Sequence, residues 1–509
     1  MVRDLDQLTA GPFDLLVVGG GALGAFAAWD AADRGLRTAL IERYDFGGGT
    51  TAASGRVLHG GLRSLQYLDP AGALTSLREQ ATIATIAPNL VRPLPFLFPA
   101  GSGSRERALL RGAASAWRAV PRLLGLQREL PPPRFHPSAR EMDPELRPWA
   151  PGGGLVVWDL QIRSPERLAV AVVRAAVDAG AVAANRVEAR QTMLADGRVN
   201  GVHAIDVETG TELEVQARHT LNCAGPWSRE LWRDPVRSAY PIGFARGLHL
   251  VAELEGVPAC ALGLDWWSDA DSGRLLRGRR IFAMPWEDRT LVGATWDPVD
   301  GPPAREVRPL APEIVSFAAA IRDRWPGLGL EPEGLRFATV GLYPVFGTET
   351  VPAQTYAASR RPLVLDHRAR GGPDGLVSAV SVKLTTARHL AESLVDLVAR
   401  RLADQGVRAG PCGTRTAGPL PHADPPTATE ARAFGRTAAR EEMARDLSDA
   451  LHRRSTLGLR GIPARDLLER VAAGMGEVLG WDETRRRREI LDFTAPYARM
   501  GIDRDGGGA

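Results

Sequence analysis

The segment FDLLVVGGGALGAFAAWDAADRGLRTALIE, residues 13–42, decides the fold of this chain. Its first six residues are a short apolar run, which is typical of a buried parallel strand. The glycine-rich GGGALG follows at once, then an alanine-rich stretch with a helical pattern that ends at Gly35, and then a second apolar run that ends in Glu42. Strand, glycine turn, helix and strand make a complete βαβ unit, so the sequence predicts an α/β domain with a parallel sheet.

The glycine spacing in GGGALG predicts a dinucleotide site. Gly19 allows the tight turn after the strand, Gly21 lets the backbone approach a pyrophosphate, and Gly24 lets the helix pack closely on the strand. The N–H groups and the dipole at the helix N-terminus favour phosphate. Glu42, at the end of the second strand, is placed to accept hydrogen bonds from a ribose diol, and its charge disfavours NADP. The alternative is a glycine-rich turn that binds no ligand.

The composition is ordinary for a soluble globular protein and excludes one large class. The chain has 509 residues, of which 44% are hydrophobic and 24% are charged. A chain of this length can bury a large core without disulfide or metal staples. Its 63 basic and 60 acidic residues leave a formal net charge of only +3. We therefore expect no nucleic-acid-binding surface.

Cysteine usage and hydropathy bear on the compartment. Cys223, Cys260 and Cys412 are widely spaced and have no accompanying histidine pairs, so they predict neither a disulfide framework nor a metal site, and they fit a reducing compartment. Residues 15–29 form the longest apolar run, but fifteen residues that include four glycines are too few to span a bilayer. The polar start of the chain lacks the pattern of a signal peptide. We therefore expect a cytoplasmic protein.

The remainder of the chain predicts a second region and a helical end. Residues 187–222 have the pattern of a β-meander with two short turns. Residues 239–344 are mixed, with several strand-like runs and one helical stretch. Residues 414–427 are rich in proline, glycine and threonine and predict a linker, and residues 428–497 have a helical pattern. The arginine run 485–488 is expected on a solvated helical face, although a lipid or partner contact is the alternative.

The chain resembles the FAD-dependent glycerol-3-phosphate dehydrogenase family over residues 13–497. The glycine-rich turn and six further motifs carry the resemblance: DFGGGTTAASGRVLHGGLR (45–63), LVRPLPFLFP (90–99), NCAGPW (222–227), MPWEDRTLVGAT (284–295), VKLTTARHLAE (382–392) and LHRRSTLGL (451–459). The sequence HGGLR after a loop rich in glycine, serine and threonine is specific to this family, and the ordered set of motifs is more specific still.

The resemblance implies a three-part architecture. A discontinuous Rossmann-like FAD-binding domain is expected, with an inserted mixed-sheet substrate domain and a C-terminal helical domain. The implied ranges are 1–90, 155–238 and 345–413 for the FAD-binding domain, 91–154 and 239–344 for the substrate domain, and 428–500 for the helical domain. The fold class is therefore α/β, or α+β when the whole chain is considered.

The resemblance also implies the cofactor and the reaction. The family binds FAD and oxidises a secondary alcohol to a ketone, passing a hydride to flavin N5 and electrons on to a quinone or to oxygen. The residues expected to bind the cofactor lie in four of the motifs or next to them: Gly19, Gly21, Ala22, Leu23, Gly24, Glu42, Arg43, Thr50, Thr51, Ser54, His59, Gly60, Gly61, Ala224, Gly225, Lys383, Leu384 and Thr385. For His59 a purely structural role is the alternative.

Three residues are candidates for catalysis. His249, in ARGLHLV, matches a family histidine of the substrate pocket, and histidine suits base chemistry near neutral pH. Arg63, in HGGLR, resembles the family's substrate-binding arginine. Lys383 is the single lysine among the 63 basic residues, and the matching family lysine lies beside flavin and substrate, where a compact ammonium differs from a guanidinium. The alternatives are a core histidine, a structural ion pair and a surface lysine at a helix start.

Four departures from the family pattern fall in the expected substrate pocket. Ser64 and Ala387 each stand where the family has a tyrosine, Tyr343 stands where the family has an arginine, and Trp296 replaces an aspartate. Losing a charge-assisted hydrogen bond costs about 1.5–3 kcal/mol, or roughly ten- to a hundredfold in affinity. The expected substrate-binding residues are Arg63, Ser64, Tyr343, Arg360 and Arg361, where the last two could supply a replacement cation.

Three functions remain open from the sequence. The first is oxidation of glycerol 3-phosphate or a related phosphorylated polyol. The second is an oxidase or dehydrogenase of the same family that acts on a different alcohol or amine, for example in secondary metabolism. The third is a non-catalytic flavin-binding protein. The expected partners are a small hydroxylated substrate and a quinone or oxygen, and the sequence leaves open a homodimer and a peripheral contact with the inner face of a membrane.

Overall fold

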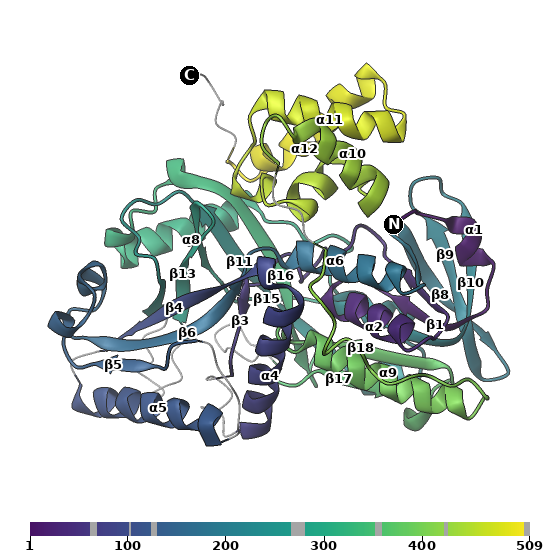
Figure 1. Ribbon diagram of the computed structural model, residues 1–509, viewed down its shortest axis with the longest axis horizontal. Helices are drawn as coiled ribbons and strands as arrows, with labels where there is room; N and C mark the ends of the chain where they lie inside the picture. Colours follow the sequence, from purple (N-terminus) through teal and green to yellow (C-terminus); the bar gives the residue numbers. More distant parts are fainter. Residues whose placement is uncertain are drawn as a thin grey trace.

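The computed structural model has two sheets side by side and a group of helices over them (Figure 1). It describes residues 1–61, 69–100, 103–123, 130–265, 280–351, 359–421 and 426–502. Arg63 and Ser64 therefore lie outside the described residues.

The first sheet contains the predicted βαβ unit, which the structure confirms as β1, α2 (Ala22–Asp33) and β2. Its strand order is β17-β18-β10-β1-β2-β7. All these strands are parallel except β17, which is antiparallel to β18. The strands are β1 (Phe13–Val18), β2 (Thr38–Ile41), β7 (Val182–Ala184), β10 (Glu212–Asn222), β17 (Leu363–Asp366) and β18 (Leu376–Val380).

Both faces of the first sheet are covered, which explains why its central strand is apolar along its length. On one face, Leu15 and Val17 of β1 pack in one core with the helices α2, α6 (Pro165–Asp178) and α9 (Ala387–Ala403). On the other face, Leu16 and Val18 pack with the meander and with helix α1. The meander was predicted at residues 187–222, and the structure confirms it. Its elements are β8 (Val187–Ala195), β9 (Arg198–Asp206) and β10, and α1 spans Leu5–Thr9.

The second sheet is mixed and has the order β15-β11-β14-β13-β12-β4-β6-β3, with β16 on β11 and β5 on β6. Residues 155–162 were expected in the FAD-binding domain, but they belong to β6, a strand of this sheet. The strands are β3 (Val57–Leu58), β4 (Val91–Pro99), β5 (Arg134–His136), β6 (Gly154–Ile162), β11 (Ile242–Ala252), β12 (Ala261–Asp265), β13 (Arg280–Trp286), β14 (Arg289–Gly293), β15 (Asp297–Val299) and β16 (Leu335–Phe346). The helices beside them are α4 (Pro70–Ile86), α5 (Ser104–Leu123) and α8 (Ala311–Arg324).

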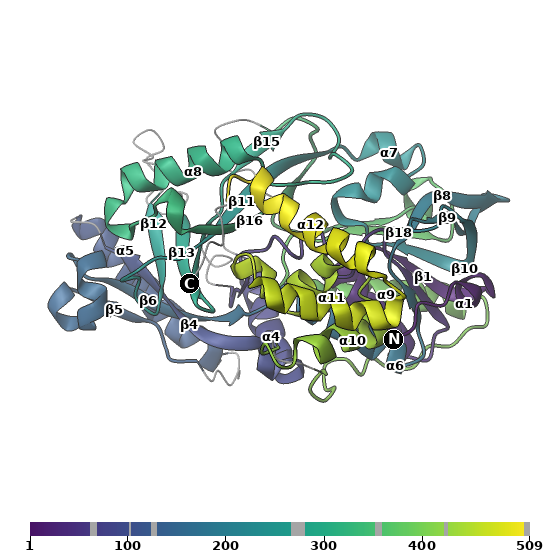
Figure 2. The same ribbon diagram turned by 90° about the horizontal axis from the view of Figure 1, so that it is seen from above.

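The C-terminal region is helical, as predicted, and lies over the junction of the two sheets (Figure 2). Its buried aromatic residues Phe493 and Tyr497 share a core with Phe337 of β16. The arginine run at 485–488 lies on α12, where Arg487 and Arg488 are exposed and pair with acidic neighbours on the same helix. The elements are α10 (Ala431–Glu442), the π-helical turn η8 (Asp449–Arg454), α11 (Arg465–Leu479) and α12 (Glu483–Arg499).

The described residues contain neither a membrane-crossing helix nor a metal-binding cluster. None of the described helices is both long enough and apolar enough to cross a membrane. Within the same residues, no group of three or more histidine, cysteine, aspartate or glutamate side chains is arranged to hold a metal ion. Cys223, Cys260 and Cys412 are all free thiols.

Candidate active site

The carboxyl ends of the parallel strands β1, β2, β10 and β18 meet at one edge of the first sheet. At this edge the N–H of Gly19 donates to the carbonyl of Ile41 over 2.8 Å, and the N–H of Cys223 donates to that of Val18 over 2.8 Å. The turns that follow these strands therefore lie side by side. In open parallel sheets this is the edge where ligands bind.

The glycines of the first turn are required by close contacts. Gly19 has φ +105°, and a Cβ there would lie 2.7 Å from the carbonyl oxygen of Cys223. A Cβ on Gly24 would collide with the carbonyl oxygen of Gly19. A Cβ on Gly21 would meet only Thr51 Oγ1, at 3.2 Å. Gly19 and Gly24 are thus fixed by packing, whereas the space above Gly21 is open to a ligand.

The N-terminus of α2 opens at this turn. Gly21 is its N-cap and provides no side-chain cap. The hydroxyl of Thr51 accepts a hydrogen bond from the N–H of Ala22 over 3.0 Å, while Leu23 and Gly24 belong to the same first turn. The first N–H groups of a helix lack partners within the helix, so this end can bind an anion.

Glu42 holds the turn from the end of β2. Its Oε2 accepts from the N–H of Gly20 over 2.7 Å, and its Oε1 accepts from the N–H of Tyr44 over 2.8 Å. Burial raises the pKa of Glu42, while these two hydrogen bonds act in the opposite direction. Each carboxylate oxygen keeps a second lone pair. Glu42 can therefore order the turn and still accept a hydrogen bond from a ribose.

Arg43 and Trp227 lie together beyond Glu42. The guanidinium carbon of Arg43 lies 5.0 Å from the ring centroid of Trp227, and the Trp227 indole donates to the carbonyl of Ala304 over 2.9 Å. A Cβ on Gly49 would lie 3.3 Å from the same indole. The sequence prediction did not include Trp227 as a site residue, although it ends the NCAGPW motif.

The turn after β10 is ordered by Asn222. Its side-chain oxygen accepts from the N–H of Ala224 over 3.2 Å, and its amide donates to the carbonyl of Ser228 over 2.8 Å. Gly225 follows with φ +56°. These contacts present Ala224 and Gly225 at the same edge as Gly19.

The loop at residues 50–55 links the two sheets. The hydroxyl of Thr50 donates to the carbonyl of Leu342 on β16 over 3.4 Å. A Cβ on Gly341 would lie 2.9 Å from Cβ of Ala53, so loop and strand are in close contact. Ser54 Oγ is buried and has no hydrogen-bond partner among the described residues. A buried hydroxyl of this kind needs a partner, which a bound ligand can provide.

A second loop brings His59, Gly60 and Gly61 to the turn after β18. The N–H of His59 donates to Thr385 Oγ1 over 3.0 Å, and the buried Thr385 lies just before α9. Asp159 of β6 accepts from the N–H of Gly60 over 2.9 Å, and its other oxygen lies 3.4 Å from His59 Nδ1. Sequence reasoning missed Asp159 because no motif marks it.

Lys383 and Leu384 lie in the turn between β18 and α9. Lys383 is exposed, and Leu384 packs against the core of the first sheet. Ala387, which stands where the family has a tyrosine, is the buried first residue of α9. The turn that carries Lys383 is joined to the His59 loop by Thr385.

His249 faces the loop at 50–55 from the second sheet. On β11 the residues Ala245, Gly247 and His249 share one face, opposite to the core residues Leu248 and Leu250. Only 3% of His249 is exposed, and its Nε2 lies 3.5 Å from the position that a Cβ on Gly55 would occupy.

Tyr343 and Trp296 form an aromatic wall on the same face. Tyr343 pairs with Ala245 in register, and its ring lies across Gly247, where a Cβ would collide with it. The ring centroids of Trp296 and Tyr343 are 5.4 Å apart, and Trp296 is buried. The aromatic wall therefore borders the space next to His249.

Arg360 and Arg361 follow close to Tyr343. The N–H of Ser359 donates to the carbonyl of Pro344 over 3.1 Å, and its hydroxyl accepts from the N–H of Phe346 over 2.8 Å. Ser359 thereby fixes the start of the SRRP segment on β16, and both arginines are exposed.

The residues at this edge fit FAD. The glycine turn and the open N-terminus of α2 suit a pyrophosphate, and Glu42 suits a ribose. The Ser54 hydroxyl, which has no partner in the described part of the chain, suits a polar ligand atom. The glycine turn lies on one side of the 50–55 loop, and His249 and the aromatic wall lie on the other. The arrangement is that of an oxidoreductase that binds a dinucleotide between a parallel sheet and a second, mixed sheet.

Comparisons with known proteins agree with this class. Residues 14–380 match the FAD dependent oxidoreductase family, and residues 414–486 match the C-terminal domain of alpha-glycerophosphate oxidase. The chain is 30% identical over 443 residues to a glycerol-3-phosphate dehydrogenase of Synechocystis sp., covering 83% of this chain and 76% of the relative. It is 32% identical over 429 residues to glycerol-3-phosphate dehydrogenase 1 of Mycobacterium bovis, covering 81% and 77%.

A solved structure shares the whole fold. The glycerol-3-phosphate dehydrogenase of Bacillus halodurans, complexed with FAD, superposes with a TM-score of 0.70 at 23% identity, covering 99% of this chain and 98% of that one. The chain belongs to the FAD-dependent glycerol-3-phosphate dehydrogenase family. Its cofactor is FAD, and it is an oxidoreductase.

Proposed function

We propose that this protein oxidises a small secondary alcohol to a ketone, with glycerol 3-phosphate or a related phosphorylated polyol as its substrate. The observation that supports this most strongly is the position of His249, a buried imidazole that faces the loop at 50–55. A general base in this position lies between the cofactor edge and the aromatic wall. The curated relatives are named for glycerol 3-phosphate, which agrees with the proposed substrate class.

The proposed roles follow from the chemistry of each side chain. FAD, when bound, supplies the acceptor for the hydride at N5 of its flavin. His249 accepts the proton of the substrate hydroxyl, for which a neutral imidazole is suited near neutral pH. Arg63, Arg360 and Arg361 supply positive charge for a phosphate, which arginine binds with two parallel N–H groups. Lys383 orients the substrate beside the cofactor.

The cofactor contacts are proposed along the sheet edge. The turn residues and the two loops described above would hold FAD, with Glu42 on the ribose and the N-terminus of α2 on the pyrophosphate. The first sheet serves cofactor binding and the second sheet substrate binding. We also propose that the protein acts in the cytoplasm, with a quinone or oxygen as the final electron acceptor.

Anaerobic titration of the purified holoenzyme tests the substrate. Glycerol 3-phosphate is added in steps while the visible flavin absorbance is followed. Loss of the flavin absorbance is expected, because the cofactor becomes reduced when the alcohol is oxidised. A spectrum that stays unchanged, with a holoenzyme that dithionite still reduces, would contradict glycerol 3-phosphate as the substrate.

Replacing His249 tests the base. His249→Asn keeps a polar side chain but removes the base, and general base catalysis contributes about 10²- to 10⁴-fold. We expect the rate of flavin reduction by substrate to fall by that factor while FAD stays bound. A reduction rate within threefold of the wild-type rate would show that another group takes the proton.

A second candidate is favoured by the aromatic wall. Tyr343 and Trp296 stand where the family has an arginine and an aspartate, and they lie next to His249 on one face of the sheet. Such a wall suits an alcohol or amine with an apolar or aromatic group. A panel of such substrates in the same anaerobic titration distinguishes this candidate from the first.

A further inference from the structure

We propose that Arg454 of the C-terminal helical domain is a positioning residue of the FAD site. It acts through Asp45, and it holds the segment 45–51 against the glycine turn and the N-terminus of α2. The proposal depends on FAD as the cofactor and not on the identity of the substrate.

Arg454 and Asp45 form a buried ion pair between regions that are 409 residues apart in sequence. Both side chains are fully buried. Nη1 of Arg454 donates to Asp45 Oδ2, and Nη2 donates to Oδ1 over 3.0 Å. Nη2 also donates to the carbonyl of Glu442 over 2.5 Å, which fixes the guanidinium within its own domain. Asn185 adds a hydrogen bond to Asp45 Oδ1 over 2.9 Å.

The segment after Asp45 contacts the cofactor turn directly. The N–H of Gly47 donates to the carbonyl of Gly20 over 2.9 Å. The fully buried ring of Phe46 lies under Gly20, where a Cβ would come within 2.6 Å of it. Thr51 then accepts from the N–H of Ala22 at the start of α2. Any shift of Asp45 is therefore transmitted over a few residues to the groups that meet the pyrophosphate.

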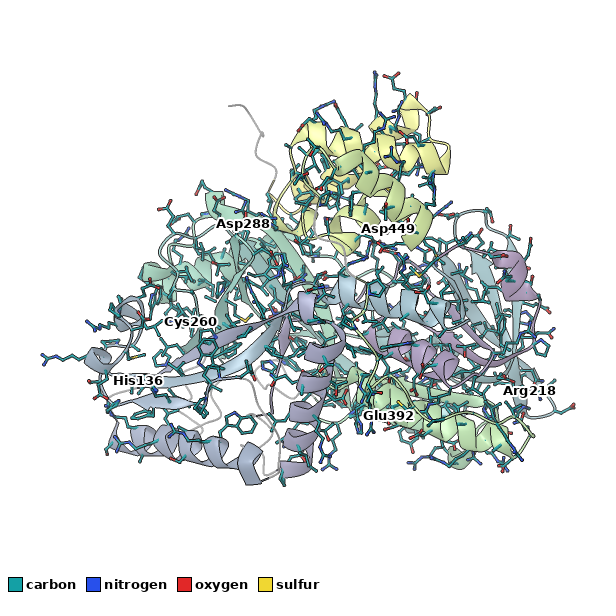
Figure 3. All side chains as sticks on the ribbon, in the orientation of Figure 1. His136, Arg218, Cys260, Asp288, Glu392 and Asp449 are labelled. Atoms are coloured by element: carbon teal, nitrogen blue, oxygen red, sulfur yellow. The ribbon has the colours of Figure 1, made fainter. Side chains whose placement is uncertain are left out.

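A second contact links the same two regions. The N–H of Arg186 donates to the carbonyl of Tyr44 over 2.9 Å. The guanidinium of Arg186 donates to Asp449 Oδ2 over 2.8 Å and to Asp446 over 2.6 Å. Figure 3 labels Asp449 at the base of the helical domain, where it faces the first sheet. Through η8, the helical domain therefore contacts the chain in two ways just after β2, where it leads into the 45–51 segment. One contact is the pair of Arg454 with Asp45, and the other passes through Arg186 to Tyr44.

The physical consequence follows from the burial of the pair. Removing one partner of a buried ion pair leaves an uncompensated charge, which is costly, whereas removing both partners is often close to neutral. Without Arg454, Asp45 keeps only the hydrogen bond from Asn185 and the more distant Arg453, whose Nη1 lies 3.7 Å from Asp45 Oδ2, so it moves toward Arg453 or takes up a proton. Either change releases the 45–51 segment from the position in which Gly20 and Thr51 order the turn.

The affinity of the folded apoprotein for FAD tests the proposal. Flavin fluorescence quenching gives the Kd after FAD has been removed and the fold verified by circular dichroism. For Arg454→Met we expect Kd to rise about 100-fold, which corresponds to the lower range of a broken buried pair. Arg454→Lys keeps the positive charge but cannot form the two parallel hydrogen bonds to Asp45, so the Kd for FAD is expected to rise about tenfold.

Arg445→Met is the matched control. Arg445 crosses the same interface and binds Glu208 through two hydrogen bonds of 2.9 and 2.8 Å, but its guanidinium does not contact the 45–51 segment. Its Kd for FAD is expected to stay within threefold of the wild-type value. Arg454→Met with an unchanged Kd, or Arg445→Met with an equal loss, would overturn the proposal, because Arg454 would then serve only domain docking.

A double variant covers the case in which Arg454→Met does not fold. Asp45→Asn with Arg454→Met removes both charges and is expected to fold. If Arg454 acts through Asp45, the double variant binds FAD no more weakly than Asp45→Asn alone. A further loss of affinity in the double variant, beyond threefold, would show that Arg454 acts by another route and would overturn the proposal.

Discussion

At the scale of single residues, Tyr343 is the side chain that we expect to bear most on the choice of substrate. The family resemblance implies an arginine at this position, whereas here an aromatic ring lies across Gly247 and packs beside Trp296. A guanidinium in its place would stack on the indole, which favours cations, and would offer two N–H groups to a phosphate. We therefore expect the aromatic wall to influence whether a phosphorylated or an uncharged substrate end binds.

Tyr343→Arg is expected to improve the use of glycerol 3-phosphate. Restoring one charge-assisted hydrogen bond is worth about 1.5–3 kcal/mol, so KM should fall roughly ten- to a hundredfold. Steady-state kinetics with an artificial electron acceptor measure this. Tyr343→Phe, which keeps the ring and removes only the hydroxyl, is the control and should not lower KM. An unchanged KM in Tyr343→Arg would mean that the phosphate binds elsewhere.

At the scale of elements, the contact between the glycine turn and α2 was predictable from sequence, but its tightness was not. The apolar run and the GxGxxG spacing are local signals. That a Cβ on Gly24 would collide with Gly19, while one on Gly21 meets only Thr51 Oγ1, depends on how the helix packs on the strand. The same local pattern therefore contains two glycines that packing requires, Gly19 and Gly24, and one, Gly21, that we expect to face the ligand.

Gly24→Ala is expected to lower the stability of the fold, whereas Gly21→Ala is expected to weaken FAD binding. Gly24→Ala forces α2 away from the turn, and overpacking of this type costs about 1–3 kcal/mol. Urea unfolding of the apoprotein should show this loss. Gly21→Ala should leave the unfolding free energy within about 0.5 kcal/mol, as expected for a site without a packing role, and should instead weaken FAD binding. Equal losses of stability in both variants would contradict the assignment.

The β17–β18 hairpin contains a buried histidine with a consequence for stability. Burial lowers the pKa of His367 to about 4, and nearby Asp366 opposes this shift. The side chain is fully buried, and Nε2 lies 2.9 Å from Ser378 Oγ. In the unfolded chain the pKa of histidine is near 6.5, so the unfolded state binds more protons between the two values. The stability that neutral His367 contributes is present above pH 6.5 and is lost as the pH falls to about 4.

Replacing His367 should flatten this pH dependence. Between about pH 4 and 6.5, His367→Gln is expected to reduce the slope of the unfolding free energy against pH by up to about 1.4 kcal/mol per pH unit, the value for one proton. Urea unfolding at several pH values measures the slope. If His367→Gln does not change the slope of the unfolding free energy against pH, His367 must already bind its proton in the folded state.

At the scale of the whole molecule, the sequence pattern predicts the local units better than their assembly. The βαβ unit, the meander and the helical end follow from periodicity and turn residues. The pairing of β6 with β3 and β4, the position of His249 opposite Gly55, and the pair of Asp45 with Arg454 all join distant segments. No spacing rule connects such positions, because strand pairing and domain docking are set by the packing of the complete chain.

The packing also implies that the helical domain is not an independent unit. Phe493 and Tyr497 share a core with Phe337 of the second sheet, and Arg454 is buried against Asp45 of the first. Arg460 binds Asp288 over 2.5 Å, a residue that Figure 3 labels beside the base of the helical domain. Contacts of the helical domain with both sheets predict that all three parts unfold together.

Hydrogen exchange of the holoenzyme after one substitution tests this cooperativity. Phe493→Ala removes a fully buried ring from α12, at a cost of about 3–5 kcal/mol. If the molecule unfolds as one unit, amides in β1 and β11 lose the same opening free energy as those in α11, because all of them exchange through global unfolding. Leu491→Ala, on the same helix but 67% exposed, should change none of them. Loss of protection confined to α11 and α12 would instead show that the helical domain opens alone.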